Sequence, residues 1–547
     1  MDCAGLNLGG KSSPLFLHTI ALAIPAQDFL PIGTMDRMAG FHIENFGCRA
    51  ARADGEAVST RLLATGLTES KLSEADVVVV NTCSVTAEAD RDARAFVRKT
   101  RRLNPQAKVV VTGCYAQRAP EEIAALDGVS AVVGNSHKGL VPQIIQEMLG
   151  AEVAAPLIPS TNLFSSSAMG RVWADDSFAH SYIEDAQVLP GLQTRPNLKI
   201  QEGCGNRCTF CVIPTTRGAS RSLAADKVLA QVRGFAAAKG KELVISGINL
   251  GRWGWDLPEK QSLASLLREI LSETGLPRLR LSSIEPMDWT PELIGLMRDF
   301  GGRNLARHAH LPLQSGSDAV LRRMHRRYRP WHYEQKIAAL LEAAGPELAI
   351  GADVMVGFPG ETEAEFLETY ELIAGLPFAY LHLFPFSPRP GTRGWELHRQ
   401  CPVATQAVNE WMAALRDLIS EKTHRFRAGF VGKRLPAITL HTPEQIAAQG
   451  ATSALTDNFL PVEIAEPIAS NRLVAVRIAG LRARGRDGAG VLLGDAWPSA
   501  VPKSGARIAP GAPQGAVLLD QQSVPARPHR YHEQDETVNF PTVSSGI

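Results

Sequence analysis

Three cysteines with the spacing C-x3-C-x2-C constrain this chain more than any other feature. They are Cys204, Cys208 and Cys211, and they lie in the stretch LKIQEGCGNRCTFCVIP, directly after a strand-like run. A structural zinc site or a ferredoxin-type cluster is normally closed by four thiolates from nearby sequence, and no fourth cysteine follows close behind these three. The spacing therefore predicts a metal centre that keeps one position open for a small ligand.

A second set of three cysteines lies in the first part of the chain. Cys48, Cys83 and Cys114 each end a strand-like run, at intervals of 35 and 31 residues, close to the length of one β-α-β unit. We therefore expect a parallel α/β sheet over residues 39–150, with the three thiolates converging at the carboxyl ends of its strands. With eight cysteines in 547 residues, metal or redox chemistry is favoured over a disulfide scaffold, and Cys3 and Cys401 are read as incidental thiols.

Six strand-like segments recur over residues 196–423, each followed by a stretch of helical character. Six β/α units are too few to close an eight-stranded barrel, so the pattern predicts a partial (β/α)6 barrel with a lateral opening. Residues that close each strand should line its site. The candidates at these strand ends are Ser246, Gly247, Asn249, Ser283, Glu285, Gln314, Asp353, Phe358 and Pro359.

Beyond these patterns, the chain resembles the methylthiotransferase family of radical S-adenosylmethionine (SAM) enzymes. The resemblance is carried by the C-x3-C-x2-C loop with its Gly203, Asn206, Phe210, Ile213 and Pro214, and by the text NTCSVTAEADRDAR, NPQAKVVVTGCYAQ, HLPLQSGSD and GFPGET. It implies an amino-terminal α/β domain, a radical SAM barrel and a small carboxy-terminal β-barrel of the TRAM type. It also implies two [4Fe-4S] clusters, one on Cys204, Cys208 and Cys211 and an auxiliary one on Cys48, Cys83 and Cys114.

The same resemblance assigns roles to the strand ends. Ser246, Gly247 and Asn249 would hold the SAM amino group, Ser283 and Glu285 its ribose and amine, and Gln314 its ribose or carboxylate. Asp353, Phe358 and Pro359 would lie on the adenine side, with Phe210 beside the cluster or the adenine. One SAM would donate a methyl group to sulfur at the auxiliary cluster, and a second would supply the radical that activates the target carbon.

The VT-x-x-AD text after Cys83 is most like the enzymes acting on threonylcarbamoyladenosine, which implies a substrate at adenosine 37 of tRNA and a 2-methylthio product. Isopentenyladenosine 37 and a ribosomal-protein aspartate are alternatives within the family. A non-catalytic iron–sulfur protein that binds RNA or senses redox state is the alternative from another class. The expected partners are a tRNA anticodon stem-loop, an electron donor such as flavodoxin or ferredoxin, and a sulfur source, for a monomer in the cytoplasm without a membrane segment.

Four local features have more than one interpretation. The segment from Arg49 to Gly55 departs from the family pattern, which leaves the hydrogen bonds near Cys48 open. The basic helix from Asp90 to Arg102 either meets RNA phosphate or is a solvated surface, and the run from Met324 to Arg329 either steers an anionic substrate or is a basic surface helix. Trp253, Trp255 and Asp256 are a candidate base-stacking platform.

The remaining segments are read from composition. Residues 1–38 indicate disorder or a misassigned start, residues 151–195 a linker, and residues 487–547 a disordered tail. Residues 424–486 predict the small RNA-binding β-barrel. This segment contains nine Lys or Arg residues and four Asp or Glu residues. This local excess favours a polyanionic partner, although the whole chain has a net charge of only +1.

Overall fold

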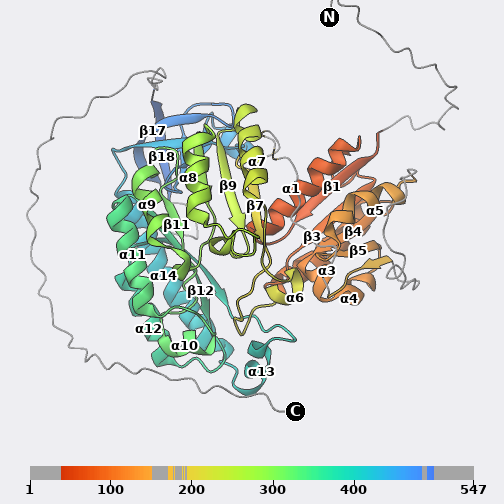
Figure 1. The fold of residues 1–547 in the computed structure, drawn as a ribbon, viewed down its shortest axis with the longest axis horizontal. Helices are drawn as coiled ribbons and strands as arrows, with labels where there is room; N and C mark the ends of the chain where they lie inside the picture. The colour runs from red at the N-terminus through yellow and green to blue at the C-terminus, as the bar shows by residue number, and fades with distance from the viewer. Residues whose placement is uncertain are drawn as a thin grey trace, which may run out of the picture. The chain divides into compact units, whose positions relative to one another are not determined.

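The structure is a computed structural model, and it describes residues 38–150, 171–176, 178, 188, 190, 194–482 and 490–497. The expectations for residues 1–37, for most of the linker and for residues 498–547 lie outside the described residues. Figure 1 draws the described elements in sequence colours, from red for the first domain to blue for the last strands. None of the described helices is both long enough and apolar enough to span a bilayer.

The first domain is built on a six-stranded sheet with the order β2-β1-β3-β4-β5-β6, in which every pairing is parallel. Its strands are β1 (Gly40–Asn45), β2 (Thr68–Glu69), β3 (Val77–Thr82), β4 (Lys108–Gly113), β5 (Val129–Gly134) and β6 (Arg171–Trp173). Its helices are α1 (Arg49–Ala64), α2 (Ala87–Leu103), α3 (Cys114–Arg118), α4 (Pro120–Ala124) and α5 (Val141–Met148). The predicted parallel α/β domain is confirmed.

Both faces of this sheet are buried, which explains the runs of consecutive valines. Val77 and Val79 pack into the core under α1 and α5, whereas Val78 and Val80 pack into a second core under α2, α3 and α4. Successive side chains of a strand point to opposite faces, so a strand covered on both sides is apolar throughout. One expectation is corrected: β6 lies inside the segment read as a linker, because a three-residue strand is too short to show a period.

The central domain carries the six expected parallel strands in two sheets, ordered β10-β9-β7-β8 and β11-β12-β13. The strands are β7 (Asn197–Glu202), β8 (Arg221–Ser222), β9 (Glu242–Gly247), β10 (Arg278–Leu281), β11 (His308–His310), β12 (Ala349–Val356) and β13 (Phe378–Pro385). An isolated bridge from Leu279 to Leu305 and a bond from Ile284 N to His310 O of 3.1 Å join the two sheets. The result is an open barrel with β8 as a short antiparallel addition.

Nine helices of the described chain belong to this domain. They are α6 (Ile213–Arg217), α7 (Ala225–Ala237), α8 (Leu263–Glu273), α9 (Pro291–Phe300), α10 (Asp318–Arg323), α11 (Pro330–Ala344), α12 (Glu363–Gly375), α13 (Arg393–Gln400) and α14 (Thr405–Ala428). A single large core joins helices to strands, with Trp289 and Tyr333 among its fully buried residues. Figure 1 shows α1 of the first domain next to β7 of the barrel.

A closed five-stranded barrel follows α14, as expected for the carboxy-terminal module. Its strands are β14 (Arg434–Thr439), β15 (Thr452–Thr456), β16 (Pro461–Ile464), β17 (Leu473–Arg482) and β18 (Val491–Trp497), with the short helix α15 (Glu444–Ala447) after β14. The barrel extends beyond the expected boundary at Arg486, because β18 is needed to close it between β16 and β17. The sequence around β18 is rich in glycine, so its pattern does not predict a strand there.

Candidate active site

The first cysteine triad lies at the carboxyl ends of three neighbouring strands. Cys48 is the N-cap of α1 after β1, Cys83 follows β3, and Cys114 begins α3 after β4. Burial raises the pKa of the Cys83 thiol to about 12, and the nearby Cys48 and Cys114 add to the rise. The thiols therefore converge as the strand pattern predicts, and burial favours the protonated form of Cys83.

The surroundings of this triad suit thiolate ligands. Val85 N lies 3.5 Å from Cys83 Sγ, and Cys114 Sγ accepts from Asn135 Nδ2 at 3.4 Å and from Arg217 Nε at 3.2 Å. N–H donors aimed at sulfur stabilise the anionic form that binds iron. The donor set thus fits a cluster held by three cysteines.

The second triad occupies the loop between β7 and α6. Backbone N–H groups point at two of its sulfur atoms. Asn206 N lies 3.4 Å from Cys204 Sγ, and Ile213 N lies 3.4 Å from Cys211 Sγ. Burial raises the pKa of the Cys211 thiol to about 12. All three cysteines line one cavity of about 780 Å³. The arrangement again fits a cluster with three thiolate ligands.

Two glycines precede these cysteine positions and permit close packing. Gly47, with φ of +100°, lies where a Cβ would come within 2.3 Å of Cys83 Cβ. Gly203, with φ of +70°, lies where a Cβ would come within 2.0 Å of Ala219 O. Glycine alone combines the left-handed backbone with this absence of side-chain volume. Both turns that present cysteines therefore depend on glycine.

Four neighbouring strands bring polar side chains together: Ser283 follows β10, His310 ends β11, and Asp353 and His382 lie within β12 and β13. Ser283 Oγ lies 2.5 Å from His310 Nδ1, and Asp353 Oδ1 lies 3.4 Å from His310 Nε2 and 3.1 Å from His382 Nδ1. Burial opposes ionisation of Asp353, but hydrogen bonds from the two imidazoles outweigh it and hold its pKa well below the usual range. The ligand atoms of His310, Asp353 and His382 lie within 4.8 Å of one another, which is close enough to hold a cation.

The other candidates at the strand ends differ in their surroundings. Ser246 is fully buried, and its hydroxyl approaches Leu198 O of the neighbouring strand at 3.5 Å. Asn249 Nδ2 lies 3.6 Å from Cys204 Sγ. Gln314 has φ of +64° and a buried Oε1 that finds no hydrogen-bond partner in the described part of the chain. Gln314 therefore retains an acceptor for a ligand, whereas the Ser246 hydroxyl is directed into the sheet.

Phe210 and Phe358 meet on the other side of the cysteine loop. Their rings pack edge to face with centroids 6.5 Å apart, and Phe358 is fully buried. Pro359 is buried beside it. This contact fixes the loop of the second triad against the fifth strand end.

The run from Met324 to Arg329 is only partly a surface feature, because Arg326 is buried while His325 and Arg327 are exposed. The Arg326 guanidinium donates to Cys208 Sγ at 3.3 Å and to Glu285 Oε2 at 2.5 Å. Burial disfavours the charge of Arg326, but Tyr328, Glu285 and Cys208 outweigh it and hold its pKa well above the usual value. Arg326 thus links a cysteine of the second triad to the third strand end.

Burial settles the interpretation of the tryptophan pair, whereas both interpretations of the basic helix α2 stay open. Trp253 is 0% exposed and donates Nε1 to Leu223 O at 2.9 Å, so it is no part of a stacking platform. Asp256 instead accepts from Ser222, whereas Trp255 is 57% exposed with Arg252 over its ring at 3.9 Å. On α2, Asp90 is buried and pairs with Arg118 and Arg389. The basic residues Arg91, Arg98, Lys99, Arg101 and Arg102 of that helix are exposed.

A second cavity, of about 490 Å³, lies between the two domains. Cys48 and Arg49 line it from the first domain, and the barrel contributes Gly247 at the end of β9, Ser283 after β10 and Asp353 within β12. The cysteine of one triad and the SAM-side candidates of the barrel therefore share one chamber.

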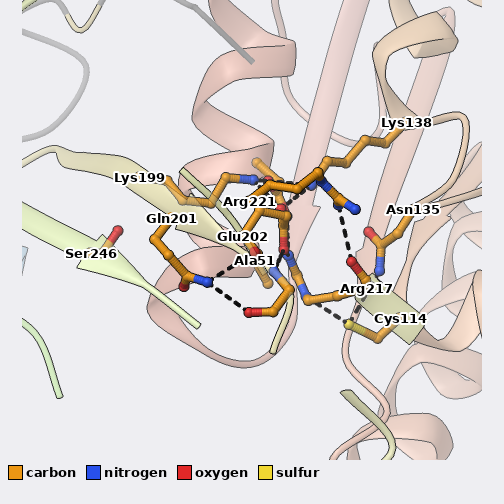
Figure 2. Close-up of polar contacts among 12 residues, drawn as sticks. Ala51, Cys114, Asn135, Lys138, Lys199, Gln201, Glu202, Arg217, Arg221 and Ser246 are labelled. Atoms are coloured by element: carbon orange, nitrogen blue, oxygen red, sulfur yellow. Dashed lines mark hydrogen bonds and ion pairs between the residues drawn. The ribbon is translucent and has the colours of Figure 1, made fainter. Parts of the chain in front are cut away.

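A buried network of charged side chains joins the two domains next to the first triad (Figure 2). Arg217 NH1 lies 3.0 Å from Asp54 Oδ2 and 2.8 Å from Glu202 Oε1. Lys138 Nζ lies 3.1 Å from Asp54 Oδ1 and 2.5 Å from Glu202 Oε2, and Lys199 contacts the same two carboxylates. Burial would raise the pKa of Glu202, but Arg217, Lys138 and Lys199 hold it well below the usual value. The three cations face only two carboxylates, so the network has an excess positive charge beside Cys114.

This network was not predicted, although the sequence contains one signal for it. Lys199 and Glu202 are charged residues in a strand that is buried along its whole length. Charged residues in such a strand require buried partners. The partners Asp54, Lys138 and Arg217 come from distant segments, which a single sequence does not connect. The departure from the family pattern after Cys48 thus includes a carboxylate of the domain interface.

Two protein-family models match the first domain and the open barrel of this chain. A model described as "Uncharacterized protein family UPF0004" matches residues 40–134, and the Radical SAM superfamily model matches residues 198–373. The open barrel with its cysteine loop is thus that of a radical SAM protein. Such proteins use a [4Fe-4S] cluster and SAM.

Relatives narrow this class. Threonylcarbamoyladenosine tRNA methylthiotransferase MtaB of Aquifex aeolicus (strain VF5) is 34% identical over 421 residues, which cover 77% of this chain and 95% of the relative. MtaB of Bacillus subtilis (strain 168) is 34% identical over 432 residues, which cover 78% of this chain and 90% of the relative. A tRNA-2-methylthio-N(6)-dimethylallyladenosine synthase of Geobacter metallireducens is 31% identical over 448 residues, which cover 80% of this chain and 95% of the relative. The chain belongs to the methylthiotransferase family of radical SAM enzymes and is of the MtaB type.

Proposed function

We propose that this enzyme converts N6-threonylcarbamoyladenosine at position 37 of tRNA into its 2-methylthio derivative. The observation that carries the proposal is the chamber of about 490 Å³ that Cys48 shares with Gly247, Ser283 and Asp353. A transfer of sulfur to a carbon needs the sulfur site and the radical site to reach the same atom, and reacting groups must be held in close contact. The relatives named MtaB support threonylcarbamoyladenosine as the substrate.

The proposal assigns two clusters to the two triads. Cys204, Cys208 and Cys211 would hold the cluster that binds SAM, and Cys48, Cys83 and Cys114 the auxiliary cluster. When bound, these groups supply the radical and the methylated sulfur, respectively. The chain contributes the N–H donors that favour thiolate at each triad, and Arg326 and Arg217 bring a positive charge to Cys208 and Cys114. The tRNA, an electron donor and a sulfur source are the proposed partners, in the cytoplasm.

Iron content tests the two-cluster assignment. Wild-type protein reconstituted without oxygen should bind about eight irons, and Cys83→Ala and Cys204→Ala should each bind about four, because each variant loses one site. The Cys401→Ala variant is the matched control, since Cys401 belongs to neither triad. About eight irons in either triad variant would contradict the assignment.

Activity on defined RNA tests the substrate. Reduced, reconstituted protein with SAM and a sulfide source is incubated with anticodon stem-loops that carry threonylcarbamoyladenosine, isopentenyladenosine or unmodified adenosine at position 37. Mass spectrometry of the nucleosides should find the methylthio product only with the first RNA. Modification of the isopentenyl RNA alone would transfer the assignment to that substrate. SAM cleavage without any RNA product would direct the search to the ribosomal-protein aspartate.

A further inference from the structure

Arg49 places a positive charge in the chamber shared by the two domains. It follows Cys48 at the start of α1 and lines the same cavity as His310, Asp353 and His382. The side chain is half-buried, and its Cζ lies 5.9 Å from the centre of the Phe459 ring. In the described part of the chain, Arg49 forms no ion pair. A guanidinium in this position can accept an anionic ligand without breaking an existing salt bridge.

Other buried arginines next to the barrel differ from Arg49 because carboxylates already neutralise them. Arg280 Nε lies 2.7 Å from Glu242 Oε1, and Arg217 pairs with Asp54 and Glu202. Burying a charge is costly unless it is paired, and a guanidinium presents a planar set of donors that matches a carboxylate. A carboxylate is therefore the ligand group that best completes the surroundings of Arg49.

Besides lining the chamber, Arg49 contacts an aromatic ring of the carboxy-terminal barrel. The ring beneath its guanidinium, Phe459, packs at a tilt against His308 with centroids 4.5 Å apart and against Tyr380 at 5.2 Å. His308 is the first residue of β11, whereas Ser283 lies beyond the carboxyl end of β10. The carboxy-terminal barrel supplies Phe459, so the module expected to bind RNA also forms the floor under Arg49.

We propose that Arg49 binds the carboxylate of the amino acid attached at N6 of the substrate adenosine and thereby selects adenosines that carry this charge. The inference rests on the proposed function and adds the residue that distinguishes threonylcarbamoyladenosine from isopentenyladenosine. A base held beside Cys48 has its N6 substituent within the same chamber. An apolar substituent there would leave the Arg49 charge unpaired, which disfavours the isopentenyl substrate.

The test uses two stem-loops that differ only in charge. One carries threonylcarbamoyladenosine, and the other carries its amide, in which a carboxamide replaces the carboxylate. Wild-type enzyme should favour the acid by roughly ten- to a hundredfold in kcat/KM, as expected for a charged hydrogen-bonded pair. Arg49→Gln should modify the acid and the amide at similar rates, and Arg49→Lys should keep part of the preference. Fluorescence anisotropy of labelled stem-loops should show the same loss of discrimination in Kd.

Two controls separate this role from others. Arg52→Gln alters a charge on the exposed side of the same helix and should keep the full preference. The second control measures 5′-deoxyadenosine and S-adenosylhomocysteine formation without RNA, which should be unchanged in Arg49→Gln. A loss there would show that Arg49 holds the carboxylate of SAM, and the inference would be overturned.

The outcomes distinguish the inference from the function on which it rests. If wild-type enzyme modifies the acid and the amide equally well, or if Arg49→Gln keeps the full preference, Arg49 does not read the carboxylate although the function stands. If wild-type enzyme modifies neither RNA but modifies the isopentenyl stem-loop, the proposed function fails, and the inference fails with it. Iron content of Arg49→Gln equal to wild type excludes a folding defect as the cause of any loss.

Discussion

The guanidinium Nε of Arg217 lies 3.2 Å from Sγ of Cys114, although the residues belong to different domains and are 103 positions apart. The same guanidinium pairs with Asp54 and Glu202 through NH1. One side chain of the barrel therefore holds the domain interface together and donates to a cysteine of the first triad. Lys138 and Lys199 also pair with Asp54 and Glu202, so these carboxylates have cationic partners besides Arg217. The positive charge of Arg217 is therefore available to the sulfur atom of Cys114.

Arg217→Gln should lower the midpoint potential of the auxiliary cluster, because a nearby cation and an N–H···S bond stabilise the reduced form. A charged hydrogen bond worth about 1.5–3 kcal/mol corresponds to on the order of 60–130 mV for one electron. A redox titration followed by electron paramagnetic resonance measures the shift in a Cys204→Ala background, where only the auxiliary cluster remains. Arg326→Gln in that background is the control, since Arg326 contacts Cys208. An unchanged potential in Arg217→Gln would refute the tuning role.

Gly47→Ala should prevent assembly of the auxiliary cluster, because its Cβ would lie 2.3 Å from Cys83 Cβ. Gly66→Ala is a matched control in the same domain. Its φ of +88° is similarly left-handed, but no atom lies within 4 Å of the added Cβ. Both variants incur the backbone cost of about 1 kcal/mol, and only Gly47→Ala adds a clash with a ligand. Reconstituted iron should fall from about eight towards about four in Gly47→Ala alone, and equal iron in both variants would argue against the steric explanation.

Glu56 makes the stability of the domain interface depend on pH. It accepts from Asn197 N at 3.1 Å and from Asn197 Nδ2 at 3.3 Å, and burial raises its pKa from 4.5 to about 7 despite these bonds. The folded state therefore holds a proton more tightly than the unfolded state. The stabilising contribution of protonated Glu56 is complete below about pH 4.5 and is lost as pH rises towards 7.

Glu56→Gln removes this titration, so the variant should gain stability relative to wild type as pH rises from 5 to 8. The relative gain is at most about 3 kcal/mol, from a difference of roughly two pKa units. Urea unfolding at several pH values, without oxygen, measures the difference in unfolding free energy. Asn197→Asp is no suitable control because it adds a charge; Glu147→Gln, on the exposed surface of α5, is the matched one. A difference that stays constant across the pH range would disprove the assignment to Glu56.

The sequence predicted those parts of the site that depend on spacing along the chain. Cys48, Cys83 and Cys114 were predictable because each ends a strand of a parallel sheet, and parallel strands end at one edge. Cys204, Cys208 and Cys211 were predictable from their spacing alone. The six strands of the open barrel followed from their regular recurrence, and the carboxy-terminal barrel from its change to short alternating segments.

The parts that depend on contacts between distant segments were not predictable. Arg326 looked like one residue of a basic run, and only the fold shows that it is buried between Cys208 and Glu285. Trp253 looked like a surface platform, but its ring fills the barrel core. The excess positive charge beside Cys114 arises from residues of both domains, so no local pattern could reveal it.

The measurement that tests the central claim most directly is mass spectrometry of nucleosides from bulk tRNA of a strain without this protein. The 2-methylthio form of threonylcarbamoyladenosine should be absent there, while threonylcarbamoyladenosine itself persists. It should return with the wild-type protein and not with Cys83→Ala or Cys204→Ala, because each variant lacks one of the two sites. An unchanged level of the methylthio nucleoside in the strain without the protein, or its return with either variant, would contradict the account.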